Sequence, residues 1–203
     1  MLLSHTSLLG VIALYFKKES EMKEMHFFIA LEDELKSSFN YIEPERDNLG
    51  CYGAKFVSLL TSVCVEFESL SKELISVFRP NAKVGDISNI KKNLLELFPN
   101  LDENEVRITR LNVSRFPFNG WNDGSKLDWW SDYGQIKHNR IKSYHLANLN
   151  NVIDAMSALV VIVLYLSRFR DSNYHCKSGG LFVHKSMGGS LIPKGEDLPD
   201  IRP

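Results

Sequence analysis

One segment of the chain, residues 129–148, gathers side chains that can bind phosphate and transfer protons. Between residues 133 and 145 there are three basic residues, two histidines and no acidic residue. Basic groups attract phosphate through their charge, and histidine exchanges a proton near neutral pH because its unperturbed pKa is about 6.5. The pattern therefore predicts a phosphate site with acid–base capacity. The side chains concerned are Lys137, His138, Arg140, Lys142 and His145.

Aromatic residues are interleaved with these groups, and aromatic faces can stack on nucleic-acid bases. The candidate substrate-binding residues are Lys137, Lys142, Tyr133 and Asn139, with Trp130 in a supporting role. Packing that caps a helical bundle is the alternative for the aromatic side chains of this region. That alternative applies to Phe116, Phe118, Trp121, Trp129 and Trp130.

Helical geometry constrains how these side chains can act together. His138 and His145 are seven residues apart and project from nearly the same face of a helix. The same stripe continues through Leu149 and Met156, so both histidines could instead be hydrogen-bonded core residues. Arg140 and His145 diverge by about 140° on an unbroken helix. They can converge only if the helix begins late, bends, or pairs across a dimer.

A second candidate for the site lies on an earlier helix expected over residues 54–78. Glu68 and Lys72 are four residues apart, the spacing of an ordinary surface ion pair. Glu66 has two interpretations: it belongs to this solvated face, or it lies at the core edge and orients the basic group. In the second case its partner is Lys137 or Arg140.

The apolar periodicity predicts an all-α fold, a bundle of about four to five helices with a small C-terminal β-hairpin. Ser131-Asp132 offers an N-cap for the helix that carries the basic residues, and Asp86 offers one for a shorter helix. The turn of the hairpin is expected near Gly188-Gly189. The expected helices are residues 25–39, 54–78, 87–98 and, as one or two helices, 133–168, and a brief strand is expected within 106–113.

The N-terminal residues 2–16 form an apolar run that is shorter than the roughly 20 residues needed to span a bilayer. A secretory signal has positive charge before such a run, whereas here Lys17 and Lys18 follow it. A signal or anchor is the alternative to a core or surface helix. We expect residues 1–24 to be an extension or extra helix, and residues 25–203 to form a single helical domain.

Composition excludes several classes of protein. The chain has 203 residues and a formal net charge of −1, so it has no general attraction for polyanions. Its three scattered cysteines form no disulfide framework and no zinc-binding pair, which favours the cytoplasm. We therefore expect no metal site, no cofactor and no membrane association.

The same segment resembles the HEPN superfamily of helical-bundle domains, many of which are metal-independent ribonucleases of antiviral and toxin–antitoxin systems. Arg140 to His145 matches their R-x(4–6)-H pattern. Residues 25–200 also resemble a group of bacterial proteins with a recurring set of motifs. Gly134 stands where that group usually has Asn, and its members often have an apolar residue at the position of His145. The matching pieces are Glu66-Phe67 to Lys72, Pro117 to Trp121, Trp129 to Arg140, and Ala147 to Leu159.

The resemblance implies a homodimeric endoribonuclease in which Arg140 stabilises the charge on the scissile phosphate. His145 or His138 would assist attack by the RNA 2′-hydroxyl or protonate the leaving oxygen. Lys137 and Lys142 would position the phosphate backbone. An antitoxin or another defence-system protein is the partner implied besides RNA.

Two other functions stay open from the sequence. One is a non-catalytic HEPN-like module that binds RNA, a nucleotide or a partner protein. The other is a structural helical subunit of a larger assembly. Exposure of His138 and Arg140 in a cleft or across a two-fold axis favours catalysis. An exposed basic groove without a converging histidine favours binding, and burial against Glu66 or Glu68 favours the structural role.

Overall fold

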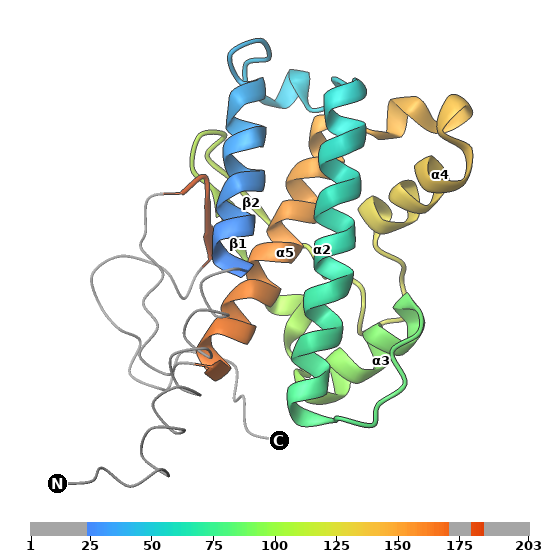
Figure 1. Cartoon of the computed structure of the whole chain (residues 1–203). Coiled ribbons are helices and arrows are strands. Elements are labelled where there is room, and N and C mark those ends of the chain that lie inside the picture. The colour runs from blue at the N-terminus through green and yellow to red at the C-terminus, as the bar shows by residue number, and fades with distance from the viewer. Residues whose placement is uncertain (1–23, 171–179, 185–203) are drawn as a thin grey trace, which may run out of the picture.

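Five helices and a small sheet form the parts of the chain that the computed structural model describes, residues 24–170 and 180–184. Figure 1 shows the helices gathered into a bundle, with α4 on one side of it. The expected fold class is therefore confirmed. The helices are residues 24–38, α2 (Ala54–Phe78), α3 (Ile87–Leu97), α4 (Asp128–Ser143) and α5 (Leu149–Arg170). Short 3-10 helices are η1 (Arg46–Asn48), η2 (Leu101–Glu103) and η3 (Tyr144–Leu146).

The most apolar helix, α5, lies at the centre of the bundle, between the N-terminal helix and α2 (Figure 1). Its residues from Val152 to Val163 are almost all fully buried. Within the described residues, Leu149–Phe169 is the one stretch long and apolar enough to cross a membrane, and 78% of its most apolar window is buried. A helix that is hydrophobic all round and covered by other helices is the central helix of a bundle.

The two helices with the strongest local signals begin and end close to where the sequence predicts. Helix α2 covers Ala54–Phe78 as expected. Helix α3 begins after Asp86, whose carboxylate accepts a hydrogen bond of 2.9 Å from the Asn89 backbone N–H. This capping bond lowers the pKa of Asp86. Apolar residues at steps of three and four predict a buried stripe on α2. Five of its residues are buried, and the last, Phe78, is partly buried. The five are Leu60, Cys64, Phe67, Leu70 and Leu74.

Three short strands form one antiparallel sheet in the order β2-β1-β3. Strands β1 (Val106–Ile108) and β2 (Val113–Arg115) form a hairpin, and β3 (Phe182–His184) pairs with the other edge of β1. Asn112 in the hairpin turn has a φ of 51°, a left-handed conformation that Asn tolerates better than most residues. The turn expected near Gly188-Gly189 lies outside the described residues.

A buried carboxylate links the first helix to the last strand. Glu32 is 3% exposed and accepts hydrogen bonds from the backbone N–H groups of Leu181 (2.6 Å) and Phe182 (3.2 Å). Lys36, one turn further along the helix, donates to the other oxygen at 2.5 Å. Because a buried charge is costly without partners, these bonds keep β3 close to the first helix. Gly180 leaves room for the carboxylate.

This contact predicts that Gly180→Ala destabilises the fold. A methyl group at position 180 would lie 2.6 Å from Glu32 Oε1, and that oxygen is fixed by two backbone bonds. We expect the free energy of unfolding to fall by about 1–3 kcal/mol, the usual cost of overpacking. Urea unfolding followed by circular dichroism measures it.

Gly134→Ala is the matched control, since a methyl group there meets no atom within 4 Å and the residue lies inside α4. It should stabilise the protein by about 0.5–1 kcal/mol, because alanine is the better helix former. Equal stability of the two variants would contradict the role assigned to Glu32.

Candidate functional site

The first half of α4 is fixed to α2 by a cluster of aromatic rings. Trp129 meets Phe67 edge-on with ring centroids 5.2 Å apart, and Trp130 lies 5.7 Å from the same ring. The indole N–H of Trp129 donates to the Pro117 carbonyl at 3.1 Å. These contacts support packing, the alternative stated for the aromatic residues, with the exception of Phe116, which is 49% exposed. They also explain why α4 begins at Asp128, earlier than the N-cap expected at Ser131-Asp132.

Tyr133 belongs to this packed cluster and does not present its ring to a substrate. It is 5% exposed and packs 5.4 Å from the Trp130 ring. Burial, with smaller contributions from Cys64 and Glu68, raises its pKa. The Lys137 ammonium lies 6.0 Å from the ring centroid on the outer side. The expected binding role of Tyr133 is therefore replaced by a supporting role beneath Lys137.

Helix α4 is broken at Asn139, where the backbone leaves the helical region with φ −148° and ψ 64°. The break separates His138 from Arg140. The break lies before both Arg140 and His145, so it does not change the angle between these two. The 140° divergence expected for them assumes one continuous α-helix. It does not apply because α4 ends at Ser143, and His145 belongs to the short 3-10 helix η3.

Beyond the first half of α4, the chemically active side chains are solvent-exposed. Their exposure excludes the core interpretation of the two histidines. Among the residues that the structure describes, no carboxylate forms an ion pair with Lys137, Arg140 or Lys142. We refer to residues 137–145 as the basic segment. Its exposed members are Lys137, His138, Asn139, Arg140, Ile141, Lys142 and His145.

The far end of the basic segment is fixed by Asn151, which is 4% exposed on the first turn of α5. Its amide donates to the Asp132 carboxylate of α4 at 2.8 Å and to the Leu146 carbonyl of η3 at 2.8 Å. One buried side chain therefore joins α4, η3 and α5. The segment is held at the aromatic cluster before the break and at Asn151 after it.

The loop before α2 pairs with the start of α5 and lies next to the basic segment. Leu149 N–H donates to the Cys51 carbonyl and Asn150 N–H to the Leu49 carbonyl, both at 2.9 Å. Asn148 caps α5, since its side-chain oxygen accepts from the Asn151 N–H at 2.9 Å. Tyr52 forms an isolated antiparallel bridge with Asn148.

An ion pair joins strand β2 of the sheet to the first turns of α5. The Arg115 guanidinium of β2 lies 3.0 Å from the Asp154 carboxylate and donates to the Asn150 amide oxygen at 2.8 Å. Asn150 in turn donates to Asp154 at 3.0 Å. Burial raises the pKa of Asp154, and the positive charge of Arg115 opposes that shift. The first two turns of α5 thus contact β2, α4 and the loop before α2.

Glu66 does not orient the basic group. It is half-buried on α2, and the described residues include no ion pair between it and Lys137 or Arg140. Burial raises the pKa of its carboxyl, and the negative charge of Glu24 raises it further. The surface pair between Lys72 and Glu68 is confirmed at 2.6 Å.

Two exposed side chains could not be assigned to the site from the sequence, one within the basic segment and one beside it. Ile141 is 91% exposed between Arg140 and Lys142, and Tyr52 is 56% exposed against the ring of Tyr144. An apolar residue between two cations at the end of a helix was the available signal for Ile141. Tyr52 carries no sequence signal, since its position depends on pairing with Asn148.

No family model, curated protein or solved structure matches this chain. Within the described ranges there is also no group of three or more His, Cys, Asp or Glu side chains that could hold a metal ion. Function is therefore inferred from the geometry of the basic segment and its neighbours.

We expect Asn151→Ala to destabilise the protein, because it leaves the Leu146 carbonyl and the Asp132 carboxylate without the amide donor that now bridges them. The expected loss is about 1–3 kcal/mol in the free energy of unfolding. Hydrogen exchange should rise at residues 139–147 more than in α2. Asn119→Ala, at an exposed turn, is the control and should change neither quantity. If hydrogen exchange in the basic segment is the same in Asn151→Ala as in the wild type, Asn151 does not anchor the segment.

Glu66→Gln tests the environment of that carboxyl through pH. Its raised pKa means that the native protein binds the proton more tightly than the unfolded chain. The free energy of unfolding therefore falls as the pH rises from the ordinary glutamate range through the raised pKa. Glu66→Gln should be more stable than the wild type at pH 7, and the difference should vanish in acid. Glu103→Gln, at an exposed site, is the control for replacing a surface carboxyl by an amide.

Proposed function

We propose that this chain is a HEPN-like protein that binds RNA through the basic segment and cleaves it without a metal ion. The observation that carries the proposal is the exposure of Lys137, His138, Arg140, Lys142 and His145 together on one broken helix end. Such a group binds the phosphate backbone irrespective of sequence. A structural role would bury His138 and Arg140 against α2, and both are exposed.

The chemistry follows from the side chains present. Arg140 offers a planar guanidinium that can contact two phosphate oxygens and stabilise their developing negative charge. One histidine accepts the proton of the RNA 2′-hydroxyl as its oxygen attacks phosphorus. The bond to the 5′-oxygen then breaks, and that oxygen takes a proton from an imidazolium. The products are a 2′,3′-cyclic phosphate and a 5′-hydroxyl, with no net change in protons.

Two histidines are available for proton transfer, one on each side of Arg140. His138 ends the straight part of α4, and His145 lies on η3 beyond the break. A homodimer would bring a histidine of one subunit to the arginine of the other. In this proposal the protein acts in the cytoplasm as an antiviral or toxin–antitoxin effector, and an antitoxin or defence-system protein is its partner.

Arg140→Ala should abolish cleavage of RNA in EDTA and weaken binding to 2′-O-methyl RNA, which lacks the attacking hydroxyl. The slope of log affinity against log salt should fall by about 1, because one phosphate contact is lost. Arg168→Ala removes the same charge from an exposed site near the other end of α5 and is the control. His138→Ala and His145→Ala should identify the catalytic histidine by lost cleavage with binding retained.

Expression of the wild type should slow bacterial growth, and Arg140→Ala or His138→Ala should relieve the effect. Binding of RNA without cleavage in any buffer would replace the nuclease by a non-catalytic RNA-binding module. Absence of both binding and cleavage would reject the proposal.

A further inference from the structure

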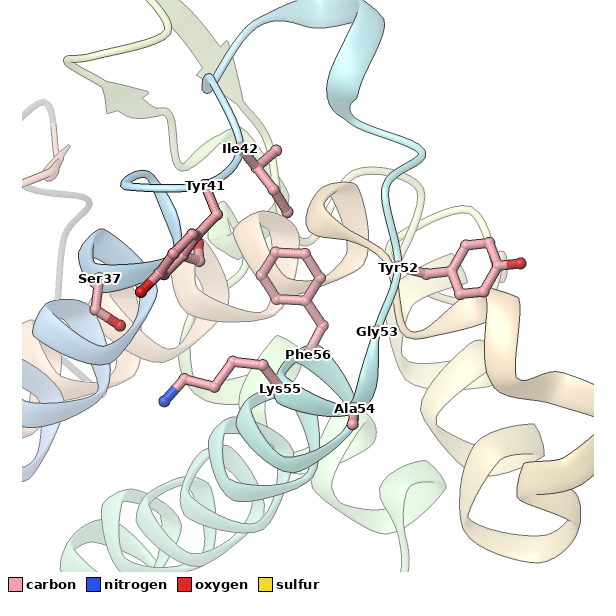
Figure 2. A pocket seen from close by; sticks show the side chains of 9 residues that line it. Ser37, Tyr41, Ile42, Tyr52, Gly53, Ala54, Lys55 and Phe56 are labelled. Atoms are coloured by element: carbon pink, nitrogen blue, oxygen red, sulfur yellow. The ribbon is translucent and has the colours of Figure 1, made fainter.

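A cleft next to the basic segment has walls suited to an aromatic ring. It has a volume of about 430 Å³ and lies between the end of the N-terminal helix and the start of α2. This volume is within the roughly 300–1,000 Å³ of small-molecule sites. Figure 2 shows Tyr41, Ile42 and Phe56 around the cleft, with Lys55 at its edge.

The side chains of the cleft favour a flat, uncharged ligand group. Phe56 is 2% exposed and forms a fixed apolar wall, whereas Tyr41 is 89% exposed and leaves nearly its whole ring available. The Lys55 ammonium lies 2.5 Å from the Glu34 carboxylate, so its charge is already balanced. The cleft therefore offers aromatic surface without net positive charge. It suits a nucleobase better than a phosphate.

Tyr52 connects this cleft to the basic segment. Tyr52 is one of the residues that line the cleft, but its ring points away from Tyr41 and Phe56 (Figure 2), toward η3. There the ring meets the edge of Tyr144 at a centroid distance of 5.8 Å and an angle of 86°. Tyr144 lies within the basic segment, as the first residue of η3 directly after the end of α4. The cleft and the Tyr52 ring thus lie on opposite sides of the chain at residue 52, and the ring contacts the basic segment at Tyr144.

The Tyr52 ring is held in place although it is more than half exposed. Its strand-like backbone pairs with Asn148, and the Cys51 carbonyl beside it accepts from Leu149 N–H at 2.9 Å. A fixed aromatic ring costs little further ordering when a ligand stacks on it. Basic side chains followed by fixed aromatic rings are the arrangement with which proteins bind single-stranded nucleic acid.

From this arrangement we propose a nucleobase-binding site, formed by Tyr52 and the cleft of Tyr41 and Phe56, for unpaired bases of the bound RNA. The inference rests on the proposed RNA binding and specifies its substrate as single-stranded. The basic segment holds the phosphates, one base stacks on Tyr52, and a neighbouring base enters the cleft. Bases paired in a duplex are unavailable to both rings.

The test compares binding of a fluorescent single-stranded 2′-O-methyl RNA with binding of the duplex of the same sequence. Tyr52→Ala and Tyr41→Ala should each weaken single-strand binding by about 5- to 150-fold, the range found for one stacked base. Duplex binding and the salt slope should be unchanged. Tyr52→Phe should bind as the wild type does, whereas Tyr52→Leu should bind as weakly as Tyr52→Ala because it lacks an aromatic face.

Val77→Ala is the control for loss of an exposed apolar side chain. Val77 is 47% exposed, and it lies about 35 Å along α2 from the cleft at 1.5 Å per residue. Circular dichroism of every variant verifies folding. Wild-type affinity in Tyr52→Ala and Tyr41→Ala, together with weakened binding in Arg140→Ala, would overturn the nucleobase site and leave the proposed RNA binding intact. A wild type that binds neither single strand nor duplex would overturn both.

Discussion

The partly buried hydrogen bonds at the N-terminus of α5 are the constraint on which the arrangement of the site depends. Asn148 caps the helix, Asn151 joins Asp132 to Leu146, and the Leu149 N–H bonds to the loop before α2. Hydrophobic burial is non-directional, so by itself it leaves the rotation of a helix as apolar as α5 some freedom. Buried polar groups allow no such freedom, since each loses a partner if the helix moves. They therefore fix the basic segment and Tyr52 relative to each other.

The two ends of α4 show why its cations are exposed. The first half uses Trp129, Tyr133 and Ile136 to cover α2, and all three are buried. At Asn139 the helix is kinked, and the short helical piece that follows is joined to Asn151 at Leu146. Ser143 is the one buried residue of this piece, and Arg140, Ile141 and Lys142 are exposed. Ile141 is 91% exposed there, which is the consequence of a segment fixed at its ends and not along its length.

Local signals allowed much of the fold to be predicted from the sequence. The features that could not be predicted depend on contacts between residues far apart in the chain. The limits of α2 and the Asp86 cap follow from periodicity and capping within a few residues. The pairing of β3 with β1 depends on Glu32, about 150 residues away along the chain, so no window of sequence contains it. The start of α4 was placed too late, because contacts of Trp129 with α2 outweigh the capping signal of Ser131.

Residue type and spacing were enough to predict the candidate cations from the sequence. They could not predict which carboxylates would pair with them. Asp132 and Asp154, carboxylates on α4 and α5, are already bonded to Asn151 and Arg115. The positive charge of the basic segment therefore has no balancing partner among the described residues. Salt weakens the interaction between exposed charges as their separation grows, so a carboxylate in direct contact would balance these cations most. A chain with a net charge of −1 can thus present a locally cationic surface to phosphate.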